Sequence, residues 1–321
     1  MKSLLQSKKI SLPDQSRSSN PLNGSDAETM AASLILSACR GEVCWGSREE
    51  DNSKIDLILS AEHPWFSKER ILVLTQVKSG DSYGTKTEQG FTLKGAAIKA
   101  AKRTSHAICV LWVCRATNQV FWAYIHPNSN ELPQEYSNYH VVSPATLFDL
   151  ARCMSRISFT SHGGSGITIR RIEGNLTNKR KQVLDIYRKF EKIFSPALGY
   201  IEFTRKGWRH MFRANRSTTY KQTSLDLIPY LEKIITQQPS EHAITDFKEW
   251  ERNGFVYRST EHLMKYNNIR YSAKGISDAQ RTTVIIKAIE EIRYPKNWQL
   301  NAMLSQCIDR RVVLMSAYCK A

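Results

Sequence analysis

The segment 55–78 constrains the fold more than any other part of the chain, because its two apolar runs, separated by a proline-containing turn, predict two paired strands. Asp56 lies in the first run, and the second run ends in Gln76, Val77 and Lys78. Residues two apart on a strand share a face, so we expect Gln76 and Lys78 to point the same way while Val77 faces the core. An acid, an amide oxygen and a lysine that converge would make a hard-cation site suited to phosphodiester hydrolysis. An ordinary hairpin with a charged rim is the alternative.

Length and charge predict two domains, of which the second is strongly basic. The chain has 321 residues, and single domains commonly have about 100 to 200. Residues 1–169 carry 18 Lys and Arg against 15 Asp and Glu, whereas residues 170–321 carry 28 against 15. A surface with that excess attracts nucleic acid or anionic lipid. The sequence has no long apolar run, no signal peptide and no CxxC pair among its seven cysteines, so we expect a cytoplasmic protein with no membrane partner.

The N-terminal half begins with a Ser-, Asn- and Pro-rich stretch, residues 1–24, that predicts a flexible leader. A helix is expected from Ser25, capped by Ser25 or Asp26, with Glu28 in its first turn. Glu28 would then either interact favourably with the helix dipole or serve as a metal or substrate-orienting carboxylate. Further along, the sequence predicts a polar loop at 80–92, a helix at 93–104, strands at 107–114 and 120–125, and a last helix at about 144–157.

This order of elements, together with Asp56, Gln76-Val77-Lys78 and the aromatic run 121–125, resembles the PD-(D/E)XK restriction-endonuclease-like superfamily over residues 25–155. It looks most like the bacterial subgroup in which Q-V-K-S replaces (D/E)xK. The resemblance implies that Glu28, Asp56, Gln76 and the backbone carbonyl of Val77 bind Mg²⁺, with Mn²⁺ as an alternative, while Lys78 positions or activates water. Gln76 replaces a carboxylate, and its neutral amide contributes less charge to a hard cation.

The predicted fold class is α/β, with a restriction-endonuclease-like mixed-sheet core at 25–157 followed by a basic α+β domain at 177–321. A Gly- and Ser-rich linker is expected between them, at 158–176. In the second domain the sequence predicts helices at 177–194 and 224–237, and strands at 199–204, 254–258, 269–272, 282–292 and 310–318.

The stretch 205–216 is the strongest candidate for nucleic-acid binding in the basic domain. It holds five Lys and Arg and no acid, with aromatic residues between them, which suits phosphate contacts combined with base stacking. In the alternative interpretation Trp208, Met211 and Phe212 belong to the core and the cations are only solvated. The predicted nucleic-acid-binding residues are Lys206, Trp208, Arg209, His210, Arg213 and Arg216.

The resemblance implies a Mg²⁺-dependent DNA endonuclease or nickase of a bacterial restriction or phage-defence system, with RNA as an alternative substrate. It also allows a homodimer or a partner protein from such a system. One other function class is a non-catalytic nucleic-acid-binding protein with a degenerate nuclease fold. Another is a toxin-like, metal-independent ribonuclease acting through the C-terminal domain, which faintly resembles barnase- and EndoU-like folds at Glu202, Thr204, His210, Arg213 and Lys287.

Overall fold

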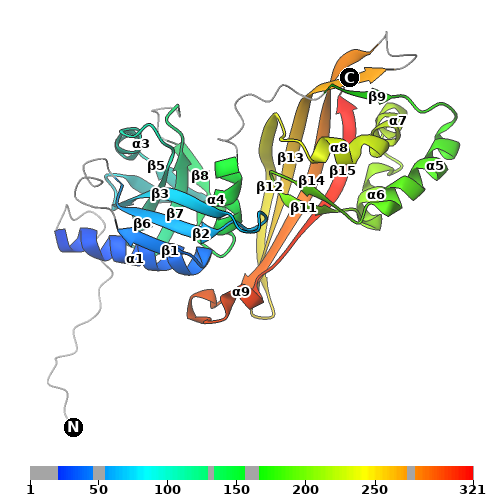
Figure 1. Cartoon of the computed structure of the whole chain (residues 1–321). Helices are drawn as coiled ribbons and strands as arrows, with labels where there is room; N and C mark the ends of the chain where they lie inside the picture. The colour runs from blue at the N-terminus through cyan, green and yellow to red at the C-terminus, as the bar shows by residue number, and fades with distance from the viewer. Residues whose placement is uncertain (1–20, 46–54, 129–133, 156–165, 273–278, 321) are drawn as a thin grey trace. The chain divides into compact units, whose positions relative to one another are not determined.

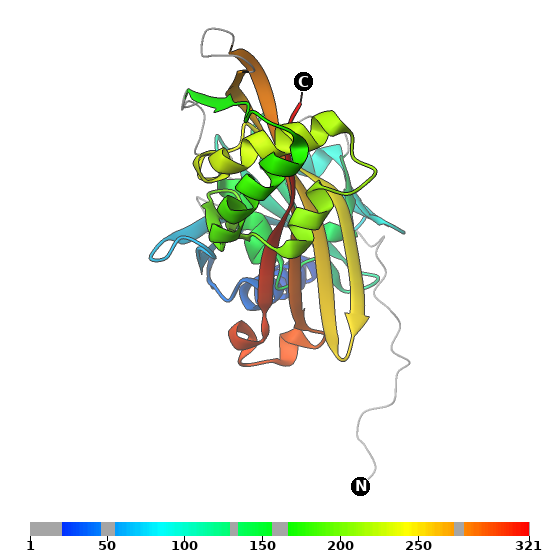
Figure 2. The same ribbon diagram turned by 90° about the vertical axis from the view of Figure 1, so that its right-hand side faces the viewer.

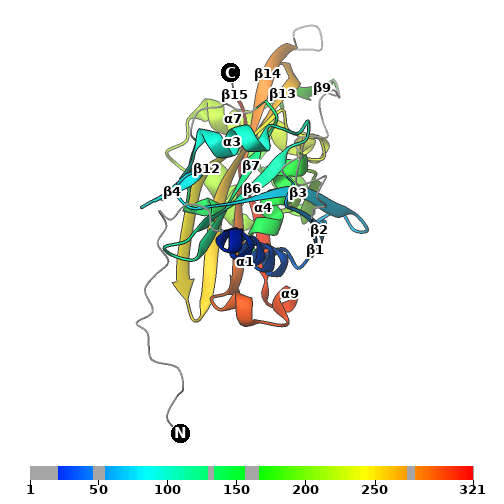
Figure 3. The same cartoon turned by 90° about the vertical axis from the view of Figure 1, so that its left-hand side faces the viewer.

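The structure is a computed structural model that describes residues 21–45, 55–128, 134–155, 166–272 and 279–320. The chain divides into two compact units, shown in Figure 1 and, in two further views, in Figure 2 and Figure 3. The first unit comprises Met1–Glu62 and Arg70–Leu150, and the second comprises His63–Glu69 and Ala151–Ala321. Helices and strands occur together in several sheets, so the predicted mixed α/β class is confirmed. Within the described ranges, no helix is both long and apolar enough to cross a membrane.

The first unit is built on a five-stranded sheet with the order β1-β2-β3-β6-β7. All neighbouring strands are antiparallel except β3 and β6, which are parallel because the chain returns through the helix α3 (Gly95–Ala101). The helix α1 (Pro21–Cys39) and α3 lie on opposite sides of this sheet (Figures 1 and 3). The strands are β1 (Glu42–Trp45), β2 (Leu57–Glu62), β3 (Arg70–Ser79), β6 (Ile108–Cys114) and β7 (Gln119–Ile125).

The strand β6, which lies between β3 and β7, is buried along its whole length, as expected for a strand covered on both faces. Val110 and Trp112 point into a core that α3 closes with Ala97 and Ile98. The helix α1 contributes small and β-branched buried side chains, which allow a helix to pack closely on a sheet; they are Ala27, Ala31, Ala32, Ile35 and Ala38.

A small three-stranded sheet adjoins this core and occupies part of the segment predicted as a polar loop at 80–92. It consists of β4 (Gly84–Thr87), β5 (Gly90–Leu93) and β8 (Gln134–Ser137). Gly90 has φ +155°, and a Cβ there would lie 1.9 Å from the carbonyl oxygen of Tyr136, so β8 approaches β5 more closely than a side chain would permit. The short 3-10 helix η1 (Asn138–His140) and α4 (Thr146–Ser155) follow.

The second unit contains a larger sheet with the order β10-β11-β15-β14-β13-β12, and β9 pairs with β13 off this path. The helical segments between β9 and β12 lie together over one face of the long strands of this sheet (Figures 1 and 2). They are α5 (Leu176–Lys189), α6 (Arg205–Met211), α7 (Thr218–Leu227), η2 (Ile228–Tyr230) and α8 (Leu231–Ile235). The connection between β14 and β15 contains η4 (Trp298–Leu300) and α9 (Leu304–Cys307). The strands are β9 (Ile167–Arg170), β10 (Lys192–Ser195), β11 (Gly199–Glu202), β12 (Glu241–Arg252), β13 (Phe255–Ser272), β14 (Gln280–Pro295) and β15 (Asp309–Lys320).

The N-terminal boundaries differ from the prediction. α1 begins at Pro21, because proline is well suited to the first helical position, so the predicted leader 1–24 is four residues too long. Ser25 and Asp26 therefore lie inside the helix and do not cap it. Residues 1–20, the rest of the predicted leader, lie outside the described residues.

The predicted linker 158–176 is wrong in its second part. Residues 167–170 form β9, which pairs in parallel with β13. Their alternation of isoleucine with polar residues is a strand signal, but the Gly- and Ser-rich neighbourhood obscures it. The second unit already begins at Ala151, and residues 156–165 lie outside the described part of the chain.

Four further differences concern the second unit. The predicted helix 177–194 ends at Lys189, because Phe190 adopts an extended conformation and leads into β10. The predicted helix 224–237 is divided at η2, which contains Pro229. β12 is absent from the prediction because this edge strand is almost wholly exposed and lacks apolar alternation, and β13 is one strand where two are predicted.

Candidate functional site

Asp56 lies just before β2, at the point where the pairing of β2 with β3 begins. Its backbone N–H donates to the Thr75 carbonyl at 2.9 Å, and Leu57 is paired with Thr75. The Oδ2 atom of Asp56 accepts a hydrogen bond of 2.6 Å from the backbone N–H of Val77. The carboxylate thus extends the hydrogen-bond ladder between β2 and β3 to a position before the start of β2. It satisfies a backbone N–H donor of β3.

Lys78 completes this arrangement from β3. Its Nζ atom lies 3.7 Å from Oδ2 of Asp56 and donates to the Val77 carbonyl at 2.9 Å. It also lies 5.7 Å from the ring centroid of Tyr83. The side chains of Lys78 and Asp56 are only 16% and 10% exposed, so this ion pair is poorly solvated yet still reached by solvent. The predicted convergence of Asp56 and Lys78 is confirmed.

The register with β6 shows which faces the three motif residues occupy. Gln76 is paired with Val110 and Lys78 with Trp112, both in the core beneath α3, whereas Val77 is paired with Leu111. Paired residues share a face, so Gln76 and Lys78 point the same way and Val77 points to the opposite side, as predicted. Gln76 is completely buried, however, instead of lying on an open rim.

Glu28 does not occupy the predicted position. α1 begins at Pro21, so its first turn contains no acidic residue and Glu28 lies farther along, half-buried. α1 also lies on the side of the sheet opposite α3, and thus opposite Gln76 and Lys78 (Figure 3). Within the described ranges, no three His, Cys, Asp or Glu side chains are grouped closely enough to hold a metal ion.

The oxygen ligands that remain for a metal are the Asp56 carboxylate, the Val77 carbonyl and the Gln76 amide. The first two lie within 4 Å of Nζ of Lys78. This set fits Mg²⁺, which is commonly bound through one or two carboxylates together with water and substrate phosphate. Zn²⁺ prefers nitrogen and sulfur ligands, which this set does not offer.

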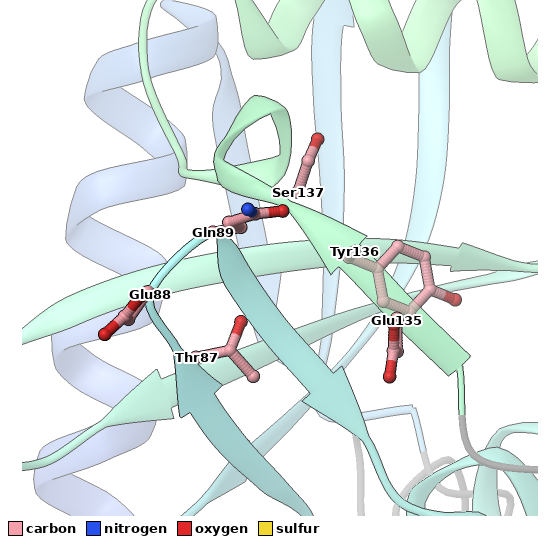
Figure 4. A pocket seen from close by; sticks show the side chains of 6 residues that line it. All are labelled: Thr87, Glu88, Gln89, Glu135, Tyr136 and Ser137. Carbon is pink, nitrogen blue, oxygen red and sulfur yellow. The ribbon is translucent and has the colours of Figure 1, made fainter.

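A separate hollow of about 550 Å³ lies over the three-stranded sheet (Figure 4). It contains none of the predicted site residues. Among the residues that the structure describes, two glutamates and no cation line it, so its charge is unsuited to a phosphate group. The lining residues are Thr87, Glu88, Gln89, Glu135, Tyr136 and Ser137.

The predicted nucleic-acid-binding stretch 205–216 forms α6 and the turn after it. Thr204 caps α6 by accepting from the N–H of Gly207 at 3.3 Å. Trp208 is 7% exposed and Met211 is fully buried, both in the core of the second unit, and Phe212 packs against that core. The core interpretation of these residues is confirmed, and the prediction that Trp208 stacks on bases is wrong because its ring is covered.

The polar members of that stretch are more accessible. Lys206, Arg209 and Arg213 are exposed, and Arg216 and His210 are half-buried. Nδ1 of His210 lies 3.1 Å from the Met315 carbonyl oxygen. Burial lowers the pKa of His210, the hydrogen bond opposes this shift, and the nearby Arg213 and Arg216 lower the pKa further.

The residues proposed for a ribonuclease make other contacts. Glu202 accepts from Nε of Arg311 at 2.6 Å, and Lys287 donates to Glu261 at 2.7 Å. With Thr204 used as a helix cap, three of the five residues that carry this alternative are engaged in local structure.

Sequence reasoning missed a buried cluster of charges in the second unit. Glu290 on β14 is completely buried, and its Oε1 lies 2.9 Å from Nη1 of Arg152 and 2.6 Å from Nε of Arg310. Its Oε2 lies 3.4 Å from Nε2 of His262, whose Nδ1 lies 3.1 Å from Nε2 of His242. A signal was present: Glu290 interrupts the apolar face of an alternating strand, Ile286, Ala288, Ile292 and Tyr294.

The cluster sets unusual protonation states. Burial alone would raise the pKa of Glu290, but Arg152, Arg310 and His262 outweigh it and hold this pKa well below its usual range. Burial lowers the pKa of His262, and Glu290 only partly opposes this shift. Glu290 is therefore ionised, and His262 is neutral around neutral pH.

Comparison of the chain with protein-family models, with curated proteins and with solved structures finds no match.

Proposed function

We propose that the first unit is a Mg²⁺-dependent nuclease module that hydrolyses phosphodiester bonds in DNA. The observation that carries this proposal is the contact of the Asp56 carboxylate with the Val77 N–H and the Lys78 ammonium at the start of β2. Apart from β4 and β5, which come between β3 and α3, the order α1, β1, β2, β3, α3, β6, β7 agrees with the order on which the resemblance to PD-(D/E)XK endonucleases rests. A cytoplasmic role in restriction or phage defence, with a homodimer or a partner protein, is carried by that resemblance alone.

Lys78 has the position that charge stabilisation requires. Hydrolysis of a phosphodiester places additional negative charge on the phosphoryl oxygens, and a fixed ammonium in a poorly solvated site stabilises that charge more than water would. Asp56 lies 3.7 Å from Nζ of Lys78, and the Val77 carbonyl at 2.9 Å orients this Nζ atom. Mg²⁺, when held by Asp56, Gln76 and the Val77 carbonyl, would supply charge neutralisation and a more acidic water molecule.

Plasmid cleavage by the full chain tests the proposal. Supercoiled plasmid and RNA are incubated with the protein in Mg²⁺ and in EDTA. We expect nicking only of the plasmid and only with Mg²⁺. Asp56→Asn keeps an acceptor for the Val77 N–H, and Lys78→Met keeps the apolar stem. Each should lower the rate by about 10²- to 10³-fold, as loss of one charge-stabilising group does, without lowering the melting temperature appreciably.

Lys99→Met is the matched control, because Lys99 is an exposed lysine on α3 of the same unit. It should cleave like the unmodified protein. Undiminished cleavage by Asp56→Asn or by Lys78→Met would contradict the nuclease proposal. RNA cleavage that resists EDTA would favour a ribonuclease instead.

A non-catalytic nucleic-acid-binding protein is the second candidate, and Gln76 favours it. This residue is a neutral amide and is completely buried, so it binds a cation less strongly than an exposed carboxylate would. Binding of DNA without any cleavage in Mg²⁺ or Mn²⁺ would support this candidate.

A further inference from the structure

Many cations on the sheet of the second unit are paired with acids. Lys287 with Glu261 and Arg311 with Glu202 are two examples, with N–O distances of 2.7 and 2.6 Å. Further pairs on the strands and their connections join Lys265 to Glu241, Arg293 to Asp309 and Lys296 to Glu251.

On α5, Arg188 is paired with Asp185, but other cations of α5, of α6 and of the turn after α6 have no such acidic partner in the described part of the chain. We define the helical basic surface as six cations that make no ion pair with any acidic side chain in the described part of the chain. Between Glu202 and Asp226 the sequence has no acid, and Asp226 is buried and bonded to Gln222 and Tyr271. The surface consists of Arg180, Arg205, Lys206, Arg209, Arg213 and Arg216.

Arg180 connects α5 to α6 through aromatic rings. Its guanidinium carbon lies 5.9 Å from the ring centroid of Trp208 and 5.4 Å from that of Phe212, and these two rings lie 4.5 Å apart. Tyr187 of α5 also donates to the Thr204 carbonyl at 3.0 Å. The rings predicted from the sequence to stack on bases therefore hold a cation in place, and Arg180 was not among the residues predicted from the sequence.

Arg216 is held in the same way at the other end of the surface. Its guanidinium carbon lies 4.6 Å from the ring centroid of Tyr220, and that ring lies 4.7 Å from the ring of Tyr318 on β15. A guanidinium fixed over a ring keeps its N–H donors available and loses less conformational entropy when it binds an anion.

We infer that the helical basic surface binds the phosphate backbone of duplex DNA without reading its sequence. Unpaired cations gain free energy from the release of counterions around DNA, whereas paired cations must first lose their acidic partners. Covered aromatic rings leave phosphate contact as the mode of binding, and phosphate contacts carry no sequence information. The choice of DNA rests on the proposed nuclease function, but the binding itself does not require cleavage.

An anionic membrane is the competing partner, and the surface lacks what such a partner needs. Peripheral membrane helices insert large apolar side chains between their cations. In the described part of the chain, the exposed large apolar side chains all lie outside α5, α6 and α7: they are Leu36, Trp45, Leu72, Tyr200, Ile244, Trp250, Leu300 and Met303.

Fluorescence anisotropy with labelled 20-bp duplexes of two unrelated sequences tests the inference. The full chain is titrated in EDTA, so a failure of the nuclease proposal does not affect the outcome. We expect equal affinity for the two duplexes and a steep dependence on salt. Arg180→Gln, Arg213→Gln and Arg216→Gln should each weaken binding severalfold and lower the slope of log K against log salt by about 0.9 for each phosphate that is no longer neutralised.

Lys265→Gln is the control, because it removes the same charge from an ion-paired position on the sheet and should change neither quantity. Arg180→Lys, which keeps the charge without the planar stacking group, should retain most of the salt slope if Arg180→Gln proves unstable. Equal effects of Lys265→Gln and Arg180→Gln would overturn the inference. The inference would also be overturned if the protein bound phosphatidylserine vesicles but not DNA, and if the arginine variants abolished that vesicle binding.

Discussion

Asp56 and Glu290 are both carboxylates held by cations in their respective units, but they differ in how completely they are shielded from solvent. Glu290 is fully buried between two arginines and a histidine. Asp56 is 10% exposed, and its contacts include Lys78 and the backbone N–H of Val77. Removing a partner from a buried, saturated charge cluster is costly, whereas a partly exposed pair can exchange partners with a substrate or metal. The comparison indicates a stabilising role for Glu290 and is compatible with the chemistry proposed for Asp56.

The largest expected effect is on Glu290. Glu290→Gln removes the negative charge and leaves Arg152 and Arg310 without it, so the free energy of unfolding should fall by about 3 to 5 kcal/mol. Urea unfolding measures this change. Glu291→Gln is the control, because Glu291 is the exposed neighbour on the other face of β14. Similar stability losses in both variants would remove the distinction between Glu290 and an ordinary surface acid.

The substitution Gln76→Glu tests whether the buried position 76 can belong to a metal site beside Asp56. In EDTA, a carboxylate at this buried position should lower the free energy of unfolding by about 1 to 3 kcal/mol, as an uncompensated buried polar group does. Added Mg²⁺ should then raise the melting temperature of the variant more than that of the unmodified protein. Gln89→Glu serves as the control, because Gln89 is exposed and the substitution adds the same charge at the surface. Equal responses to Mg²⁺ in all three proteins would exclude Gln76 from a metal site.

The third prediction concerns the stability of the protein at acidic pH. The folded pKa of His262 is lowered, while the unfolded value is about 6.5, so below that pH the unfolded chain binds a proton that the folded chain does not. Stability should therefore fall as the pH falls below about 6.5, by at most about 1.4 kcal/mol per pH unit for this proton. Urea unfolding across pH 5 to 8 measures the slope.

His262→Gln should reduce by one the number of protons taken up on unfolding, and so make the slope of unfolding free energy against pH shallower. The slope should not vanish, because burial also lowers the pKa of His210 and of His63. Glu290 affects the pH dependence of stability only at lower pH. Its pKa is depressed, so its stabilising contribution is lost only when the pH is low enough to protonate the folded carboxylate. An unchanged slope in the His262 variant would show that the buried histidine does not titrate on unfolding.

The smallest expected effect is that of Asp56→Asn on stability. The amide can still accept the Val77 N–H, and Lys78 keeps its bond to the Val77 carbonyl, so the loss should be about 1 kcal/mol. The same urea titration used for Glu290 provides the comparison. A loss as large as that of Glu290→Gln would mean that Asp56 is mainly structural and would weaken its assignment to chemistry.

Local patterns in the sequence predicted the part of the site that lies on adjacent strands. Asp56, Gln76 and Lys78 belong to one hairpin, so strand alternation and turn composition sufficed to place them together. Glu28 depended on where α1 begins, and a helix start can shift by a turn when a proline such as Pro21 offers an alternative first residue.

Partners far apart in sequence could not be predicted. Arg152 and Glu290 are separated by 138 positions, and nothing in either local segment indicates the other. The predicted role of Trp208 failed for a similar reason, since the ring is covered by α5, a helix whose packing is a tertiary property. Arg180 gained its position over Trp208 from the same packing.

The place of β15 in the sheet has a consequence for synthesis on the ribosome. This strand, Asp309–Lys320, lies between β11 and β14, so its neighbour β11 is made about a hundred residues earlier. The pairing of β9 with β13 has a similar separation. Non-local pairings close slowly, whereas the described strands of the first unit all precede residue 138. The first unit can therefore complete its sheet on the nascent chain while the second must wait for its last strand to emerge.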